Sequence, residues 1–305
     1  MKPKVIVILG PTAVGKSKIA LELAQEIGAE IINADSQQVY RFMDIGTEKP
    51  SEMEREAVPH HVIDVVNPDE EFNVAMFCRL ATASVTDIKR RGNNVIVCGG
   101  TGLYIKAFTR GLFLGPAQEP RVRASLKAEL EAHGLNFLYN RLSEVDPAAT
   151  SRIHPNDQQR IIRALEVYEL TGKPMSEWQK AHGFGERPYE TLTIGLDRER
   201  AELYERINRR CEKMIKAGLL DEVASLVEKS YGLDLKPLRS VGYRHMGLVV
   251  TGEMSLGEAL ELMKRDTRRL AKRQLTWFRQ DREIQWLHPD TERQGIREAV
   301  GLFLS

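Results

Sequence analysis

One eight-residue stretch constrains this chain more than any other: GPTAVGKS, from Gly10 to Ser17. It fits the pattern G-x-x-x-x-G-K-[ST], follows the apolar run KVIVIL and precedes the amphipathic segment KIALELAQEIG. In such a strand–loop–helix unit, backbone N–H groups surround phosphate oxygens, the lysine neutralises them and the hydroxyl binds Mg²⁺. The stretch therefore predicts a phosphate site on a parallel α/β sheet. It leaves open whether that phosphate belongs to ATP or to another diphosphate.

The rest of the chain divides into two kinds of pattern. Apolar runs that predict strands lie at 4–9, 30–35, 60–66, 94–99, 189–196 and 283–289. Helical spacing is clearest at 16–27, 73–91, 120–133, 135–145, 156–170, 199–216, 218–230 and 255–273. Because only helices are indicated between the Gly- and Pro-rich segment FLGPAQEP and residue 188, we predict an α/β, P-loop NTPase-like parallel-sheet core at 1–112 and 189–305. Residues 113–188 are then a helical insertion domain.

Composition excludes several classes of protein. The 305 residues include three cysteines, Cys78, Cys98 and Cys211, which form no C-x-x-C pair and have no zinc-ligand spacing. No apolar run has the length of a membrane span, and the first apolar run lacks the features of a signal peptide. We expect a cytoplasmic protein with no membrane association. No obligate protein partner is indicated, so we expect a monomer.

A candidate acid follows the second predicted strand. P-loop NTPases usually carry an Asp at the end of an apolar strand to hold the metal, but NVIVCGGTG has glycine at that place and Asp64 lies within its apolar run. Asp35 ends EIINAD, and the carboxyl ends of parallel strands line the ligand crevice of such sheets. Asp35 is therefore expected at the phosphate site, as a general base or a metal-organising acid. A helix cap or a surface turn is the alternative.

A basic segment near the C-terminus indicates a second ligand. Residues 264–282 contain eight Lys and Arg against two Asp. Arg265, Arg268, Arg269 and Lys272 have i, i+3, i+4, i+7 spacing, which predicts one continuous stripe on a helix. Such a stripe suits a nucleic-acid backbone. A solvated basic face is the simpler alternative.

Taken in order, eight segments resemble the tRNA dimethylallyltransferase (tRNA isopentenyltransferase) family of bacterial type. They are GPTAVGKS, NADSQQVYRFMDIGTEKP, VPHHVIDVVNPDEEFNVAMF, GGTGLYIKA, SRIHPNDQQRIIRALEVYELTGKP, LYERINRR, SVGYRHMG and AKRQLTWFR. The resemblance implies transfer of a dimethylallyl group from dimethylallyl diphosphate to N6 of the adenosine at tRNA position 37, immediately 3′ of the anticodon. The chain departs from the family pattern at Gln37, Phe42 and His245.

The resemblance also implies roles for individual residues. Asp35 is the general base, Thr12, Lys16 and Arg206 take part in catalysis, and Mg²⁺ binds at Ser17. The diphosphate-binding residues implied are Gly10, Pro11, Thr12, Ala13, Val14, Gly15, Lys16, Ser17 and Arg206. The tRNA anticodon stem-loop is expected at Asp35, Ser36, Gln37, Gln38, Thr101, Arg123, Gln159, Arg160, Ile161, Ile162 and Arg163, and on the basic helix at Arg268, Arg269 and Lys272.

Three other functions share parts of this pattern. A P-loop kinase of a small molecule would bind ATP, but it would not need the basic helix and usually has the strand-end Asp. A prenyltransferase acting on free adenine nucleotides would share the loop and Asp35, with less need of the insertion. A non-catalytic RNA-binding module would leave the loop and Asp35 without a role.

Overall fold

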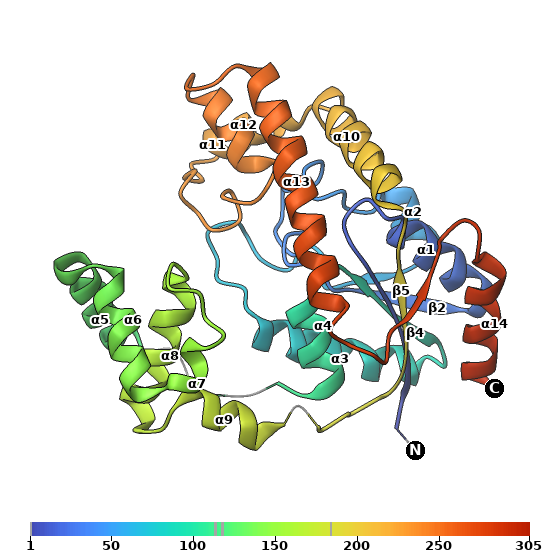
Figure 1. Ribbon diagram of the computed structural model, residues 1–305. Helices are drawn as coiled ribbons and strands as arrows, with labels where there is room; N and C mark the ends of the chain where they lie inside the picture. Colours follow the sequence, from blue (N-terminus) through green and yellow to red (C-terminus); the bar gives the residue numbers. More distant parts are fainter. Residues whose placement is uncertain (1, 113–114, 117–118, 184) are drawn as a thin grey trace. The chain divides into compact units, whose positions relative to one another are not determined.

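A single six-stranded parallel sheet organises the larger of two compact units (Figure 1). The computed structural model describes residues 2–112, 115–116, 119–183 and 185–305. Strand order is β3-β2-β4-β1-β5-β6, and every neighbouring pair is parallel. The strands are β1 (Lys4–Leu9), β2 (Ala29–Asn33), β3 (His60–His61), β4 (Asn94–Gly99), β5 (Glu190–Leu196) and β6 (Gln285–Leu287). The predicted α/β, P-loop NTPase-like class is confirmed.

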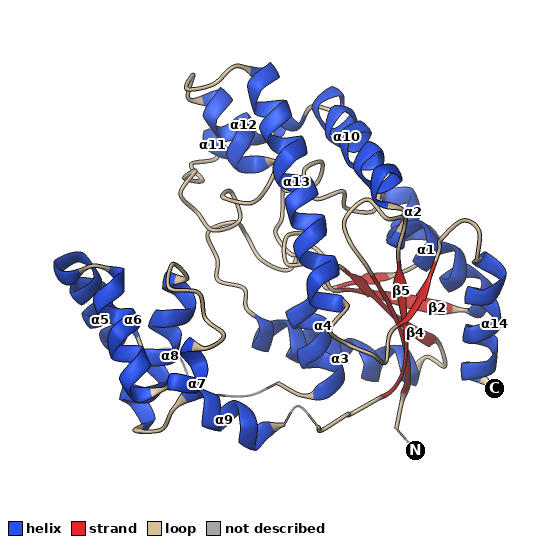
Figure 2. Cartoon of the chain, viewed as in Figure 1, coloured by secondary structure: helices blue, strands red, loops and turns tan. Residues whose placement is uncertain are grey.

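Helices cover both faces of this sheet, as the secondary-structure colouring makes plain (Figure 2). The helices of the larger unit are α1 (Lys16–Ile27), α2 (Glu52–Ala57), α3 (Val74–Arg90), α4 (Gly102–Arg110), α10 (Arg200–Lys216), α11 (Leu219–Glu228), α12 (Tyr243–Val250), α13 (Leu256–Phe278) and α14 (Arg293–Leu304). Helices α1 and α14 lie on one face, and α3 and α4 lie on the other (Figure 1). Within the described residues, none of the helices combines the length and the apolar character needed to cross a membrane.

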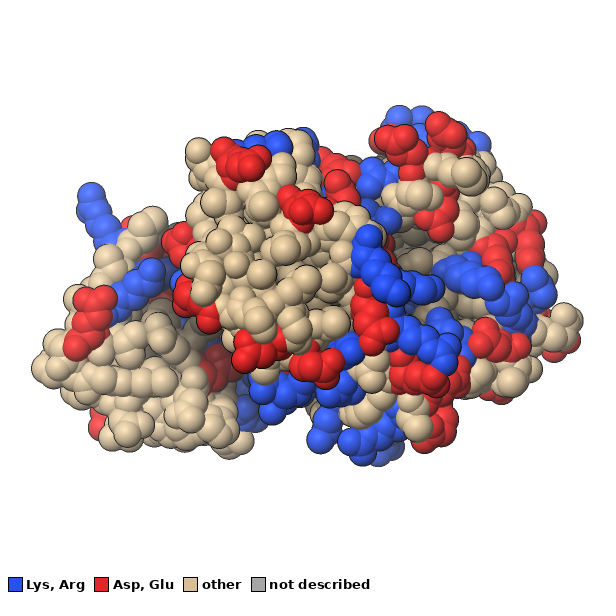
Figure 3. Space-filling view, turned by 90° about the horizontal axis from the view of Figure 1, so that it is seen from above, with Lys and Arg blue, Asp and Glu red and all other residues tan. Residues whose placement is uncertain are grey.

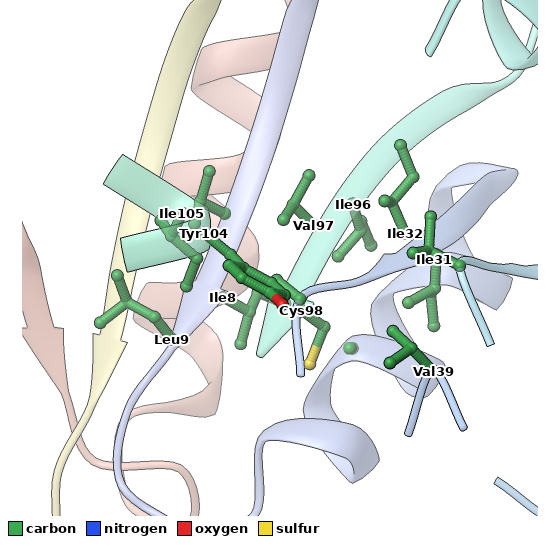
Figure 4. Packing of buried hydrophobic residues seen from close by; sticks show 14 of the residues in the cluster. Ile8, Leu9, Ile31, Ile32, Val39, Ile96, Val97, Cys98, Tyr104 and Ile105 are labelled. Carbon is green, nitrogen blue, oxygen red and sulfur yellow. The ribbon is translucent and has the colours of Figure 1, made fainter. Parts of the chain in front are cut away.

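The central strands are apolar on both faces because helices bury both. Val5, Val7 and Ile8 of β1 and Val97 of β4 have no exposed surface, which is the pattern of a parallel strand at the centre of a doubly covered sheet. Ile8 and Leu9 of β1 belong to the same buried cluster as Ile96, Val97 and Cys98 of β4, Ile31 and Ile32 of β2, and Tyr104 and Ile105 of α4 (Figure 4). This packing fixes the carboxyl ends of β1, β2 and β4, from which the site is built.

The second unit spans Arg110–Arg187 and has its own apolar core. Its helices are α5 (Pro120–His133), α6 (Leu135–Val145), α7 (Pro147–Thr150), α8 (Gln158–Thr171) and α9 (Met175–His182). Leu126, Leu138, Leu142, Ile161 and Leu165 are fully buried within it. The bounds predicted from the sequence, 113 and 188, differ from these bounds by at most three residues. Residues 113, 114, 117, 118 and 184 of the predicted insertion lie outside the described residues.

Three predicted elements were wrong in extent. The strand predicted at 283–289 forms only over Gln285–Leu287. The run 60–66 forms only the two-residue strand β3, because Val62 and Asp64 have φ values of 62° and 55° and turn the backbone into the left-handed region. The helix predicted at 255–273 continues to Phe278. Its last turn carries Gln274 and Trp277, which pack on the glycine turn after β4.

Candidate active site

The phosphate loop connects β1 to α1 with a backbone that only small residues permit. Gly10 has φ 148°, and a Cβ there would lie 2.6 Å from the carbonyl oxygen of Leu196 on β5. Gly15 has φ 109°, and Ala13 also lies in the left-handed region at 64°. Because α1 begins immediately after Gly15, its free N-terminal N–H groups lie at the loop, where an anion is favoured.

Lys16 supplies a positive charge that burial makes costly. Its Nζ donates to the carbonyl oxygen of Pro11 at 2.7 Å. Burial, the largest cause, and the charge of nearby Arg210 together lower the pKa of Lys16 from 10.5 to about 8, although Asp35 and Glu48 act in the opposite direction. A bound anion would favour the protonated form of this lysine. The loop is therefore prepared for a ligand that brings negative charge.

Asp35 lies two residues beyond β2, in a turn tied to the end of β4. Its Oδ1 accepts from the backbone N–H of Gln37 at 2.8 Å, and Thr101 Oγ1 accepts from the N–H of Ser36 at 3.0 Å. Gln38 donates through Nε2 to the carbonyl oxygens of Thr47 and Glu48. These bonds hold the Asp35 carboxylate at the cavity that is also lined by Thr12, Lys16 and Ser17.

Arg210 is a site residue that the sequence reasoning missed. Its Nη1 donates to Thr12 Oγ1 at 2.6 Å, and it lines the cavity together with Lys16 and Asp35. Arg206, the predicted diphosphate arginine, is exposed and donates through Nε to the carbonyl oxygen of Ala13 at 2.9 Å. The two arginines lie one turn apart on α10 within LYERINRR. Their i, i+4 spacing was a signal that both face the loop.

Gln274 is the second missed residue, and it joins the phosphate loop to the glycine turn GGTG. Its Oε1 accepts from the N–H of Thr12 at 2.9 Å, while its Nε2 donates to the carbonyl oxygen of Gly100 at 3.0 Å. A Cβ at Gly100 would lie 2.5 Å from Gln274, and one at Gly102 would lie 2.3 Å from Trp277. The glycines of this turn therefore admit side chains from α13.

The basic stripe predicted on α13 is interrupted, which corrects the expectation of one continuous surface. Arg268 donates to Asn208 Oδ1 at 2.6 Å and lies over the ring of Tyr204, so it packs against α10. Arg265 and Arg269 pair with Asp266, which is a buried acid. Burial alone would raise the pKa of Asp266, but hydrogen bonds from Arg265, Arg244 and His245 hold it far below its usual range. Lys272 is exposed. On the surface drawn in Figure 3, acidic side chains lie among the Lys and Arg side chains.

In the insertion, residues 159–163 were predicted to contact RNA, but some of their side chains are exposed and others are buried. Gln159 and Arg160 are exposed, whereas Ile161 and Ile162 are buried in the core of this unit, so their prediction as RNA-contacting side chains was wrong. A helix has 3.6 residues per turn, and five consecutive residues cannot all face solvent when one side packs.

Arg123 and Arg163 share a buried acid. Both pair with Glu166, which has no exposed surface, at 3.0 Å and 2.7 Å, and Arg163 also donates to the carbonyl oxygen of Pro116. These two arginines are therefore half-buried parts of the insertion's own framework as well as candidates for RNA contact.

The oxygen donors of the cavity fit a magnesium ion that also binds substrate oxygens. Ser17 and Asp35 line the cavity, and Mg²⁺ typically takes one or two protein oxygens together with phosphate oxygens and water. Among the described residues, no group of three or more His, Cys, Asp or Glu side chains could hold a metal by itself. A metal here would therefore need the ligand's phosphate groups.

These features define a P-loop protein whose site combines a phosphate cradle, an adjacent carboxylate and two arginines on α10. The IPP transferase family model matches residues 38–281, and the chain belongs to this family. It is 50% identical over 286 residues to a tRNA dimethylallyltransferase of Geobacter metallireducens, covering 94% of this chain and 93% of the relative. A tRNA dimethylallyltransferase of Desulfatibacillum aliphaticivorans is 49% identical over 303 residues, covering 99% of each chain.

Solved structures are also similar. The tRNA isopentenylpyrophosphate transferase of Bacillus halodurans aligns with TM-score 0.74 and 40% identity, over 99% of this chain and 97% of that one. A eukaryotic dimethylallyltransferase acting on tRNA aligns with TM-score 0.83 and 31% identity, over 98% of this chain and 78% of that one. The family resemblance deduced from the eight sequence segments is confirmed.

Proposed function

We propose that this chain is a tRNA dimethylallyltransferase, which transfers a dimethylallyl group from dimethylallyl diphosphate to N6 of the adenosine at tRNA position 37. The observation that carries the proposal is the convergence of Lys16, Arg210 and Asp35 on one cavity at the carboxyl edge of the sheet. The cations suit a diphosphate and the carboxylate suits a proton. The membership of the family and the names of its relatives support the choice of donor and acceptor.

The Asp35 carboxylate compensates for the weak nucleophilicity of the adenine amino group. The lone pair of the adenine amino group is delocalised into the ring, and the nitrogen becomes nucleophilic as it loses a proton. In the proposed reaction, Asp35 accepts that proton while the nitrogen forms a bond to C1 of the allyl group. A positioned base typically contributes about 10²–10⁴-fold. The hydrogen bond from Gln37 holds this carboxylate in place.

The phosphate loop addresses the leaving group. The bond between C1 and the diphosphate oxygen breaks, and the electron pair leaves with that oxygen. The loop N–H groups, Lys16 and Arg210 stabilise the charge that develops, which is most effective where water is excluded. Arg206 contacts the loop from outside through Ala13 and supports its backbone. Mg²⁺ at Ser17, with Asp35 nearby, would neutralise the diphosphate.

The acceptor is proposed to be the anticodon stem-loop, whose bases can be splayed out and extruded for chemistry. Exposed cations such as Arg160 on α8 and Lys272 on α13 are candidates for contacts to its backbone. The protein is proposed to act as a monomer in the cytoplasm.

The experiment is a product assay with purified protein, dimethylallyl diphosphate, Mg²⁺ and an anticodon stem-loop. We expect RNA heavier by one dimethylallyl group, and no such product when the adenosine 3′ of the anticodon is replaced by guanosine. Prenylated free AMP with unmodified RNA would instead identify a nucleotide prenyltransferase. ATP hydrolysis with no prenylated product would contradict the proposal.

A further inference from the structure

Arg210 and Glu48 form an ion pair that lines two neighbouring cavities of the larger unit. Arg210 Nε lies 3.0 Å from Glu48 Oε1. Both residues, together with Pro50, line the phosphate-loop cavity and also a neighbouring cavity of about 720 Å³. The larger cavity is further lined by Phe42, Ile45, Lys213 and Met214. The pair is therefore in contact with the space where the diphosphate is proposed to bind.

Arg210 needs a counter-charge because its side chain is only 18% exposed. A charge withdrawn from water is costly unless an opposite charge or hydrogen bonds compensate. Thr12 accepts one hydrogen bond from this guanidinium, and Glu48 provides the negative charge. A diphosphate on the loop would supply the same compensation more strongly, because it carries several negative charges.

Glu48 combines a fixed backbone with an exposed carboxylate. Its φ is 53°, its carbonyl oxygen accepts from Gln38 Nε2 at 3.1 Å, and its N–H donates to the carbonyl oxygen of Ile45 at 3.2 Å. Glu222 anchors the preceding loop by accepting from the N–H groups of residues 44–46. The side chain of Glu48 is 55% exposed. The carboxylate can therefore turn into solvent without unfolding the loop.

We propose that Glu48 is a placeholder for the diphosphate: it binds Arg210 before the donor arrives and opposes the diphosphate once it is bound. Glu48 thereby weakens the binding of both the donor and the product diphosphate. Weaker binding of this kind favours turnover, because uniform tight binding lowers KM without raising kcat and slows product release. The proposal rests on the proposed function of the loop as a diphosphate site, and it makes Glu48 a determinant of affinity.

The direct test is calorimetric titration of the full chain with inorganic pyrophosphate and Mg²⁺ at pH 7, where Lys16 is protonated. Glu48→Gln removes the charge and keeps the shape, and we expect it to bind pyrophosphate about three- to tenfold more tightly than the wild type. The matched control is Glu52→Gln, an exposed acid that lines the larger cavity but not the phosphate-loop cavity. It should change the affinity less than twofold.

Equal or weaker pyrophosphate binding by Glu48→Gln would overturn the proposal, because Glu48 would then be neutral or would orient Arg210 for the ligand. Glu48→Ala must shift the affinity in the same direction as Glu48→Gln. Equal tightening by Glu52→Gln would also overturn it, since the effect would then be one of general surface charge.

Steady-state kinetics give a second readout. In Glu48→Gln, the KM for dimethylallyl diphosphate should fall and inhibition by pyrophosphate should strengthen by similar factors. An increased KM would contradict the placeholder role. Failure of the proposed function would be seen separately, as wild-type protein that yields no prenylated RNA although the pyrophosphate titration still distinguishes Glu48→Gln from Glu52→Gln.

Discussion

The phosphate-loop site and the helical insertion both carry sequence motifs, but the motifs translate into structure differently. At the loop, Thr12, Lys16 and Ser17 all line one cavity, and Asp35 joins them from the next strand. In the insertion, two of the five consecutive residues 159–163 are buried in the core and one is paired with a buried acid. In the turn after β1, three residues of the motif line the cavity while Val14 is buried in the core. On the helix, the 3.6-residue period divides consecutive residues between solvent and core.

Arg206 and Arg210, on one helix, also differ in how directly they reach the site. Both lie on the side of α10 that meets the phosphate loop, and both make hydrogen bonds to it. Arg206 reaches the backbone of the loop at Ala13, while Arg210 reaches Thr12 within the cavity. One helical turn separates a residue that supports the site from one that lines it.

The largest expected effect concerns Asp35. Asp35→Asn keeps the shape and the hydrogen bond from Gln37 but cannot accept a proton, so we expect the single-turnover rate of prenylation to fall about 10²–10⁴-fold. RNA affinity, measured by filter binding, should remain nearly unchanged. The exposed Asp69→Asn serves as the control. Lost RNA binding with a normal rate would show that Asp35 is a recognition residue.

In the insertion, by contrast, we expect a substitution in the predicted RNA-contacting run to change the free energy of unfolding rather than RNA binding. Ile161→Ala removes a fully buried side chain from its core, and we expect a loss of about 2–5 kcal/mol in the free energy of unfolding, measured by denaturant titration. Gln159→Ala, at an exposed position two residues earlier, should change it by less than about 0.5 kcal/mol. If Ile161→Ala reduced RNA affinity and left stability intact, Ile161 would be a contact residue after all.

Proton uptake distinguishes the loop from an ordinary anion site. The pKa of Lys16 is lowered to about 8 before the ligand binds, and a bound diphosphate raises it, so binding near pH 8 and above should take up a proton. The affinity for pyrophosphate should then fall by up to about tenfold per pH unit above pH 8.

The measurement of this uptake is calorimetry in buffers of different ionisation enthalpy. Lys16→Met provides the control, because it removes the contribution of the lysine and leaves that of pyrophosphate itself. Identical proton uptake by the wild type and by Lys16→Met would show that Lys16 is already fully protonated in the free protein.

The smallest effect is expected on α13. Lys272→Ala should reduce the slope of log affinity for tRNA against log salt concentration by about 1, the value for one lost phosphate contact. Arg268→Ala should also lower stability, because Arg268 packs on Tyr204 and Asn208. A loss of affinity in Lys272→Ala that is equal at all salt concentrations would argue against a backbone contact.

Much of the sheet and of the loop followed from the sequence because local patterns determine them. The run KVIVIL is apolar without alternation, which is sufficient to predict a central parallel strand, and GPTAVGKS places the turn at its end. The end of the third strand could not be predicted, since Val62 and Asp64 read as strand residues. Asp64 is held in a turn by Lys49 at 2.5 Å and by Arg55 at 2.8 Å, both outside the run.

The missed site residues have the same explanation. Gln274 lies within the motif AKRQLTWFR, whose basic residues indicated RNA binding, so no role at the phosphate loop was predicted for it. Its contacts to Thr12 and Gly100 join segments separated by 262 and 174 residues. Such long-range contacts depend on how α13 packs, which no local pattern encodes.

The central claim is that the loop holds the diphosphate of a prenyl donor and not the phosphates of ATP. The most direct measurement compares thermal unfolding of the protein with Mg²⁺ and equal concentrations of dimethylallyl diphosphate or ATP. A ligand at 100 times its Kd stabilises the folded state by about 2.7 kcal/mol. We predict the larger rise in Tm with dimethylallyl diphosphate. A larger rise with ATP, and none with dimethylallyl diphosphate, would contradict the account.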